Sequence, residues 1–502
     1  MFTATRIMLS RTLKRSLPCR PLLLPQQRGL ASHADKTTRP GDEHPAHESL
    51  KKASFKPHHP VSTAIAWGEE FWRNVPAYRD VSKEQFLSYR WSLSNLNYEK
   101  QIKNCIDSMD RLHAFLNSVL PEEIPDGAGS QSKEQLMEDI YYGAKAAPIP
   151  YLLSRINWED PRNDPIFRQF IPMKSLLLPD HPKLELDSLH EKGDEPVDGL
   201  VHRYPDKALF LAVSVCPTYC AYCTRARAVG GNTECVTKQS YKPGRTRWDE
   251  IFTYIEANPQ LQDIVISGGD SFYIHPEHIR MIGDRLINIP HIRRFRFASK
   301  GLAVAPMRFI DTADDWADAL IEVSQKARDA GKAMALHTHF NHPNEFSWIT
   351  EVAAQRLNAA NVTVRNQTVL LKGINDDYQT MSTLIRKLAD NNVTPYYVYI
   401  CDMVKNSEHF RTPLQTLLDL EVQIRGTIAG FNMPQFIVDL PGGGGKRIGS
   451  TYESYDRETG VSKFKSPAIT TASGAYSWRR KKPEVFEYHD PIGHNARVDL
   501  NN

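Results

Sequence analysis

Between residues 207 and 430, short and nearly continuous apolar runs alternate with longer segments in which apolar residues recur every three or four positions. The short runs predict strands buried on both faces of a sheet, and the longer segments predict amphipathic helices. The predicted strands are 207–215, 263–268, 292–299, 333–340, 362–371 and 394–400. The predicted helices are 247–259, 276–290, 314–331, 345–361, 378–392 and 413–430. Because a helix follows every strand, the pattern predicts an α/β fold with a parallel sheet, either an open doubly wound sheet or a barrel.

The rest of the chain divides by composition into four further segments. Residues 1–34 contain several Arg and Lys but no acidic residue, which predicts a mitochondrial transit peptide, with a disordered basic tail as the alternative. Residues 35–61 are polar and predict a disordered linker. Amphipathic stretches within 62–200 predict an N-terminal helical region, and 433–502 form a C-terminal extension of the 201–432 core.

Bulk composition excludes several functional classes. A net charge of +3 over 502 residues is small, so a nucleic-acid-binding surface is not expected. No run approaches 18 apolar residues without charges, so we expect no membrane span. Seven cysteines, three of them within eight positions, are too few and too clustered for a disulfide framework, so we expect reduced thiols.

Polar or glycine-rich segments follow all six predicted strands at their C-terminal ends. Parallel strands present these ends at one edge, where ligand sites of such folds are built. Residues far apart in sequence, such as the cysteines, Asp376 and Asp402, could therefore line one cavity. The two acids could bind a cationic group of a substrate, or they could simply be surface carboxylates.

Cys216, Cys220 and Cys223 follow the first strand with the spacing C-x3-C-x2-C. Three thiolates can hold a cubane iron–sulfur cluster and leave one iron free for an outside ligand. The alternative is a zinc site completed by a histidine, for example from the HTHFNHPNE segment at 337–345. We favour the cluster, and we expect the histidines of that segment to hydrogen-bond a carboxylate or phosphate.

Two glycine-rich segments are further candidates. The sequence SGGD, Ser267 to Asp270, could bring backbone groups and a carboxylate close to a ligand, or it could be a tight turn. The sequence PGGGGKR at 441–447 does not match a P-loop. Its Lys446 could form a Schiff base with a carbonyl cofactor, and the alternative is a flexible loop.

A set of ordered motifs resembles the lysine 2,3-aminomutase group of the radical S-adenosylmethionine family. The resemblance covers roughly residues 140–450 and is specific because the motifs keep their order and spacing. The motifs are HRYPDKALF, CPTYCAYCTRAR, VISGGD, HTHFNHPNE, NQTVLLKGIND, PYYVYICD, HFRTP and VDLPGGGGK.

The resemblance implies a partial TIM-like barrel of six strand–helix units with three cofactors: a 4Fe–4S cluster, S-adenosylmethionine and pyridoxal 5′-phosphate. Cys216, Cys220 and Cys223 would ligate the cluster. Ser267, Gly268, Gly269 and Asp270 would lie along S-adenosylmethionine. Lys446 would carry pyridoxal phosphate as an internal aldimine. Arg225 would pair with the substrate carboxylate, and Asp376 and Asp402 would hold the distal ammonium of lysine.

The implied reaction is the transfer of the 2-amino group of L-lysine to C3, giving L-β-lysine, with a separate electron donor for the cluster. Alternatives are another amino acid as the small-molecule substrate, or a cluster-binding homologue without turnover. Departures from the family pattern, such as Ala226, Lys207 and the SKGL segment after the third strand, bear on substrate identity. No cysteine follows Cys401, so the subunit-bridging zinc of bacterial relatives is not expected, and a homo-oligomer stays an open expectation.

Overall fold

The computed structural model describes residues 69–89, 91, 109–127, 129–140, 149–230, 232, 236–467, 469 and 484–493. Contacts divide the chain into Met1–Phe55 and Lys56–Asn502, and every described residue belongs to the second unit. The predicted transit peptide, 1–34, and linker, 35–61, lie outside the described residues.

A nine-stranded sheet forms the centre of the described chain, with its strands in sequential order from β3 to β11. Strands β4 to β10 run parallel, whereas β3 and β11 pair antiparallel at the two edges. The strands are β3 Leu200–Tyr204, β4 Lys207–Val213, β5 Asp263–Gly268, β6 Arg294–Ala298, β7 Ala333–Thr338, β8 Thr363–Leu370, β9 Val393–Ile400, β10 Gln435–Leu440 and β11 Gly445–Ile448. All six predicted strands are present, and β3, β10 and β11 are additions to them.

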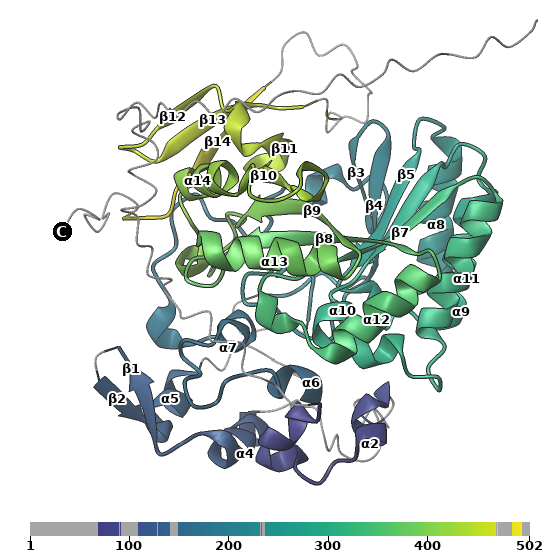
Figure 1. Ribbon diagram of the computed structural model, residues 1–502. Helices are drawn as coiled ribbons and strands as arrows, with labels where there is room; N and C mark the ends of the chain where they lie inside the picture. The colour runs from purple at the N-terminus through teal and green to yellow at the C-terminus, as the bar shows by residue number, and fades with distance from the viewer. Residues whose placement is uncertain are drawn as a thin grey trace, which may run out of the picture. The chain divides into compact units, whose positions relative to one another are not determined.

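Six helices connect the parallel strands and lie on the outer side of the sheet (Figure 1). They are α8 Arg245–Ala257, α9 Pro276–Asn288, α11 Trp316–Asp329, α12 Trp348–Ala359, α13 Tyr378–Asp390 and α14 Leu414–Ile424. Asn361 and Asn392 take positive φ angles of 56° and 57° just after α12 and α13, where a left-handed residue ends a helix and sends the chain into the next strand. The predicted α/β fold class is therefore confirmed.

The sheet curls so that its edge strands approach each other. The backbone N–H of Lys446 in β11 donates to the Tyr204 hydroxyl in β3, 2.9 Å away. No backbone ladder joins β3 to β11 among the described strands, so the barrel is incomplete at this junction. This choice of a barrel over an open sheet agrees with the partial barrel that the family resemblance implies.

The described part of the segment before the barrel contains short helices. They are α2 Lys83–Leu87, α4 Met109–Val119, α5 Lys133–Asp139, α6 Pro150–Leu153 and α7 Pro165–Phe170. This segment also contains the hairpin β1 Glu123–Asp126 and β2 Gly129–Ser132, which the sequence analysis did not predict. Four-residue strands with one buried side chain between them give too little apolar alternation to be detected.

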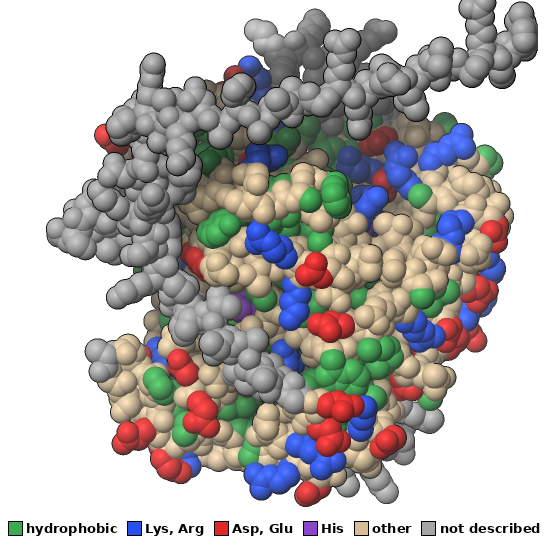
Figure 2. Space-filling model, viewed as in Figure 1, with side chains coloured by type: hydrophobic (Ala, Val, Ile, Leu, Met, Phe, Trp, Pro, Cys, Tyr) green, Lys and Arg blue, Asp and Glu red, His purple; other side chains and the backbone are tan. Residues whose placement is uncertain are grey.

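The C-terminal extension, 433–502, first adds β10 and β11 to the barrel sheet and then forms a separate three-stranded antiparallel sheet. The separate sheet consists of β12 Ser454–Asp456, β13 Val461–Lys465 and β14 Val485–His489. No helix in the described part of the chain is long and apolar enough to cross a membrane. Acidic and basic side chains are interspersed over the face shown in Figure 2, as the small net charge leads one to expect.

Candidate active site

One cavity of about 490 Å³ opens among the C-terminal ends of the barrel strands and extends into the barrel. Every predicted site residue except Asp376 lines it: Cys216, Cys220, Cys223, Arg225, Ser267, Gly268, Gly269, Asp270, Asp402 and Lys446. The thiols come from the loop after β4, whereas Lys446 comes from β11, more than two hundred residues later. The fold therefore brings the thiols and the lysine amine to the same enclosed space.

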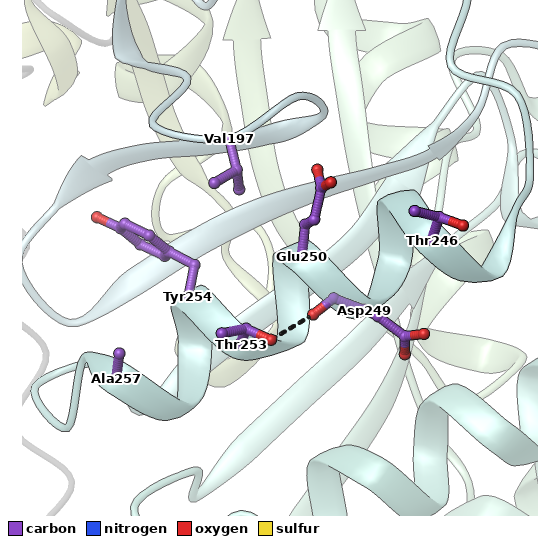
Figure 3. Close-up of a pocket in the computed structure, with 7 residues that line it drawn as sticks. All are labelled: Val197, Thr246, Asp249, Glu250, Thr253, Tyr254 and Ala257. Carbon is purple, nitrogen blue, oxygen red and sulfur yellow. Dashed lines mark hydrogen bonds between the residues drawn. The ribbon is translucent and has the colours of Figure 1, made fainter.

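A second pocket, of about 600 Å³, lies on the outer side of the barrel along α8 (Figure 3). Its lining is Val197, Thr246, Asp249, Glu250, Thr253, Tyr254 and Ala257. None of the predicted site residues is among them, so this pocket carries no catalytic group suggested by the sequence.

Burial raises the pKa of all three cavity thiols. The pKa of Cys220 rises to about 12, although the nearby Lys300 ammonium acts in the opposite direction. The pKa values of Cys216 and Cys223 are also raised, again mainly by burial. The thiols are therefore protonated at neutral pH in the metal-free protein, and metal binding must release their protons.

The cluster and the zinc hypotheses require different arrangements of ligands. Among the described residues, no group of three or more His, Cys, Asp or Glu side chains converges closely enough to hold one metal ion. A single zinc ion needs such convergence, because all its ligands bind one atom. In a cubane cluster each thiolate binds a different iron, so the ligands stand farther apart. The loop offers three thiols to one cavity, which is the donor set that a cubane cluster takes.

Close contact with a neighbouring backbone segment requires glycine at two positions of the SGGD segment. A Cβ on Gly268 would come 2.1 Å from the carbonyl oxygen of Val213, and one on Gly269 would come 2.4 Å from that of Val215. Gly268 also has φ = 123°, which is accessible to glycine. The glycines thus let β5 lie directly against the backbone that leads into Cys216, and they form one wall of the cavity.

Asp270 is engaged in local structure. Its Oδ1 accepts a hydrogen bond from the N–H of Phe272 at 2.8 Å, and its Oδ2 accepts one from the N–H of Lys300 at 2.7 Å. Burial raises its pKa, and these hydrogen bonds oppose the increase. The carboxylate therefore ties the end of β5 to the end of β6, next to the thiol loop.

Lys300 lies in the SKGL segment and is also buried against the cavity. Its Nζ forms an ion pair with Glu345 Oε1 at 3.0 Å and donates to the carbonyl of His339 at 2.7 Å. The Glu345 side chain is fully buried, so the pair places a fixed positive charge beside Cys220 in a poorly hydrated region. The sequence comparison with the family pattern flagged this position but did not show its contacts.

The predicted histidines are neutral hydrogen-bonding groups. Burial lowers the pKa of both His337 and His339 to about 3. His337 Nδ1 contacts the Gln367 amide nitrogen at 2.9 Å, and His339 Nε2 contacts the Tyr222 hydroxyl at 3.1 Å. Both line the cavity, so they can bind a polar ligand without carrying charge.

The four-glycine run before Lys446 has a steric explanation. Gly442, Gly443 and Gly445 have φ angles of 68°, 85° and 80°, a region that favours glycine. Gly444 has an ordinary φ of −65°, but a Cβ there would come 2.5 Å from Phe486 Cγ. The run is therefore a shaped turn rather than the flexible loop that we held as the alternative.

Lys446 forms an ion pair with Asp439, a residue that the sequence analysis missed. The two are cross-strand partners in the β10–β11 hairpin. Burial acts to lower the pKa of the lysine amine, but the Asp439 carboxylate outweighs it and the pKa is raised. The sequence could have indicated Asp439 only through the alternation of side chains in β10, which places Asp439 on the same face as Ile437. This alternation can be used only after β10 has been recognised as a strand.

Asp402 and Asp439 form an acidic pair in the cavity. Burial raises the pKa of Asp402 to about 7, and the charge of Asp439 acts in the same direction. The Thr224 hydroxyl donates to Asp402 Oδ2 at 2.5 Å. Asp439 Oδ1 is buried and accepts no hydrogen bond from the described residues. Two acids that repel each other around an unsatisfied oxygen are suited to bind a cation.

Asp376 lies elsewhere, in the loop after β8. Its Oδ1 accepts a hydrogen bond from the N–H of Gly373 at 2.8 Å, and its charge acts on the Arg168 guanidinium. It is not among the residues that line the cavity. The structure thus brings Asp402 to the predicted site and leaves Asp376 outside the lining.

Arg225 is held in place by Glu191. The guanidinium donates from Nε to Oε2 at 2.9 Å and from Nη2 to Oε1 at 2.9 Å, and Arg227 contacts Oε2 at 3.2 Å. Burial opposes ionisation of Glu191, but the two arginines outweigh it and hold its pKa at about 2. Glu191 binds the edge of the Arg225 guanidinium that carries Nε and Nη2, and Nη1 forms no hydrogen bond with this carboxylate.

The cavity contains several buried polar atoms without a hydrogen-bond partner among the described residues. They are Thr218 Oγ1, Asp263 Oδ1, His337 Nε2, Thr338 Oγ1 and Asp439 Oδ1. Such atoms are rare in native proteins and are unfavourable unless a ligand or water satisfies them. Basic side chains of Arg203, Lys207 and Arg296 line the same space. This lining fits polar cofactors that carry acidic groups, such as the phosphate of pyridoxal phosphate and the carboxylate of S-adenosylmethionine.

Comparison with known proteins identifies relatives over most of this region. L-lysine 2,3-aminomutase of Clostridium subterminale is 35% identical over 374 residues, covering 74% of this chain and 80% of that protein. L-lysine 2,3-aminomutase of Bacillus subtilis is 32% identical over 378 residues, covering 75% and 71%. Glutamate 2,3-aminomutase of Clostridioides difficile is 29% identical over 355 residues, covering 70% and 75%.

Two other comparisons add little. No protein-family model matches the chain. A solved structure of anSMEcpe with bound AdoMet aligns over 43% of this chain and 56% of its own, with 12% identity and a TM-score of 0.32, a similarity too low to support an argument.

The conclusion therefore rests on identity of about a third sustained along three quarters of the chain, together with a barrel that gathers the thiols and Lys446 into one cavity. The chain belongs to the lysine 2,3-aminomutase family.

Proposed function

We propose that this protein is a radical S-adenosylmethionine enzyme that moves the 2-amino group of L-lysine to C3 and releases L-β-lysine. The observation that carries the proposal is the shared cavity of Cys216, Cys220, Cys223 and Lys446. A radical generated at the thiol end can act only on a substrate held within its reach. Relatives named L-lysine 2,3-aminomutase support the choice of reaction.

The residues present fit the three cofactors of the family. The three thiols hold a 4Fe–4S cluster, the SGGD wall lies beside the place for S-adenosylmethionine, and the Lys446 amine attaches pyridoxal phosphate. When bound, the cluster and S-adenosylmethionine supply a hydrogen-abstracting radical, and pyridoxal phosphate carries the migrating nitrogen. The cluster also needs an electron donor, which a chemical reductant replaces in an assay.

Substrate orientation falls to residues of the chain itself. Arg225, braced by Glu191, offers its remaining N–H groups to the substrate carboxylate. At the other end, we assign the distal ammonium of lysine to Asp402 and Asp439 in place of Asp402 and Asp376, because both line the cavity. Binding the substrate at its two charged ends fixes the carbon chain between them.

Attachment of a carbonyl group to Lys446 changes the charge around Asp439. In the cofactor-free protein the Lys446 ammonium neutralises that carboxylate. A carbonyl cofactor attached at Lys446 would change this charge, and the Arg203 guanidinium would still act on Asp439. At an effective dielectric constant of 20, each attraction between charges 4 Å apart is worth about 4 kcal/mol. The acidic pair would therefore favour a substrate that carries a distal ammonium.

Glutamate is the second candidate substrate, because a glutamate 2,3-aminomutase is among the relatives. Its distal group is a carboxylate, which two buried acids would repel. The acidic pair therefore favours lysine.

The test is an anaerobic assay with iron and sulfide reconstitution, both organic cofactors, dithionite and lysine labelled with ¹⁵N at the 2-position. Mass and NMR spectra of the products should show the label at C3, with no comparable product from labelled glutamate. Lys446→Ala is the matched control, since it removes the attachment point alone. Cluster- and pyridoxal-loaded protein that moves no nitrogen in lysine would contradict the proposal and favour a homologue without turnover.

We also propose import into mitochondria, on the basis of the basic, acid-free composition of residues 1–34. A fluorescent protein carrying these residues should co-localise with a mitochondrial marker and should be shortened on import. Diffuse fluorescence, with no shortening, would favour the basic-tail alternative.

A further inference from the structure

We propose that the C-terminal strand β14 positions the two parts of the site that handle the substrate amine and its distal ammonium, through Phe486 and Tyr488. The inference rests on the proposed function only in assigning pyridoxal phosphate to Lys446 and lysine to the acidic pair. It concerns the part of the chain beyond residue 451, for which the sequence gave no functional indication.

Phe486 packs on the turn that leads into Lys446. A Cβ on Gly444 would come within 2.5 Å of its Cγ and 2.8 Å of its Cδ1, and one on Gly442 would come within 3.9 Å of its Cε1. A turn built from glycines has many accessible conformations, so an outside contact must select one of them. The Phe486 ring supplies that contact two residues before Lys446.

Tyr488 contacts the opposite part of the site. Its side chain is fully buried, and its hydroxyl donates to the carbonyl of Cys401 at 3.3 Å. Cys401 immediately precedes Asp402, so the contact fixes the backbone from which that carboxylate projects. Phe486 and Tyr488 are two positions apart in one strand, so they lie on the same face of β14.

A buried ion pair anchors this strand to the barrel. Arg411 and Glu408 are 0% and 1% exposed, and their side chains pair at 2.7 Å. Backbone groups of β14 and the next residues complete the pair: Arg411 donates to the carbonyl of His489, and Glu408 Oε1 accepts from the N–H of Ile492 at 2.6 Å. Without β14 these buried charged groups would lose partners, which is strongly unfavourable.

Asp490 adds a further anchor. Its Oδ1 accepts a hydrogen bond from the N–H of Leu414 at the start of α14, and its Oδ2 accepts one from the Tyr455 hydroxyl in β12. The strand is therefore held from both sides, by the barrel and by its own small sheet. A fixed strand can transmit position to the glycine turn and to Cys401, whereas a loose tail could not.

The test uses full-length protein with Phe486→Leu, Tyr488→Phe and, as the matched control on the opposite face, Val485→Ala, whose side chain is 54% exposed. The first readout is pyridoxal phosphate affinity, from a visible-absorbance titration before any substrate is added. Phe486→Leu should weaken it about tenfold, which corresponds to the loss of one well-placed packing contact. Val485→Ala should leave it unchanged.

The second readout separates positioning from folding. Tyr488→Phe keeps the ring and removes one hydroxyl, so the protein should stay folded, as a thermal scan checks. It should raise KM for lysine about three- to tenfold, with a smaller change in kcat, because the Asp402 backbone is released while the chemistry is untouched. Wild-type affinity in Phe486→Leu, together with wild-type KM in Tyr488→Phe, would overturn this inference alone. Failure of the wild-type protein to bind pyridoxal phosphate would instead overturn the proposed function.

Discussion

The ammonium of Lys446 is paired with the carboxylate of Asp439, its cross-strand partner on the neighbouring strand of one hairpin. A carbonyl cofactor attached to this amine would change the charge beside Asp439, on which the Arg203 guanidinium also acts. The hairpin would therefore couple the proposed cofactor attachment point to an acid of the cavity.

Replacing this carboxylate tests the coupling. Asp439→Asn should lower kcat/KM for lysine by about 10- to 100-fold, because one of two attractions for the distal ammonium is lost. It should also lower the pKa of Lys446, which Asp439 raises. Steady-state kinetics and the pH dependence of pyridoxal phosphate attachment measure the two effects.

The matched control is Asp376→Asn, an equal change of charge in an acid that does not line the cavity. It should leave kcat/KM within about twofold of wild type, the range expected of substitutions away from the substrate. The reverse ranking of the two variants would restore Asp376 to the substrate site and remove Asp439 from it.

Lysine binding should depend on pH through Asp402. Its pKa is raised to about 7, mainly by burial, and only the carboxylate attracts an ammonium. KM for lysine should therefore rise as the pH falls below about 7, and the dependence should be lost in Asp402→Asn. A KM in the wild type that is flat between pH 6 and 8 would contradict this assignment.

Ionisation of Asp402 also changes the free energy of unfolding with pH. The folded protein holds the Asp402 proton up to about pH 7, whereas the unfolded chain releases it near pH 4. The folded state thus binds more protons between these values, so the contribution of Asp402 to the free energy of unfolding falls as pH rises from about 4 to 7. Asp402→Asn should flatten this part of the stability profile of the cofactor-free protein in urea titrations.

Glu191→Gln should act on substrate binding. Loss of the negative charge weakens the bracing of Arg225, so KM for lysine should rise about tenfold while kcat changes less. Glu122→Gln, in an exposed ion pair with Lys133, is the control and should have no effect. Equal KM values in the two variants would show that Arg225 does not need its partner.

The thiol assignment has an internal control in Cys401. Cys220→Ser should lose the iron and the absorbance near 400 nm that anaerobic reconstitution gives the wild type, because one iron loses its ligand. Cys401 is buried but does not line the cavity, so Cys401→Ser should keep both. Iron and zinc analysis of the same samples decides between cluster and zinc, and stoichiometric zinc would reject the cluster.

Much of the fold could be predicted because its signals are local. Apolar runs marked β4 to β9, and amphipathic periodicity marked the helices between them. The thiol spacing and Lys446 were equally visible. Strands β3, β10 and β11 were missed; β11 has only four residues and begins with Gly445, and the place of all three is set by pairing with β4, β9 and β10.

The sequence alone could not predict which acidic residues line the cavity. Asp376 and Asp402 each follow a strand, so the pattern treats them alike, yet the loop after β8 turns Asp376 toward Gly373 and away from the cavity lining. Asp439 sits within a strand that was not recognised. Glu191 lies outside every predicted motif and was found only through its contact with Arg225.

The junction of β3 and β11 has one last consequence. Every other neighbouring pair of strands in the sheet is joined by main-chain pairing, whereas the described contact at this junction is the Tyr204 hydroxyl on the Lys446 N–H. Separating β3 from β11 would therefore break no main-chain ladder of the sheet. This junction lies beside Lys446, the proposed attachment point of the cofactor. We therefore expect that pyridoxal phosphate can enter after the chain has folded, by a local separation of β3 and β11 that leaves the other strand pairs of the sheet unchanged.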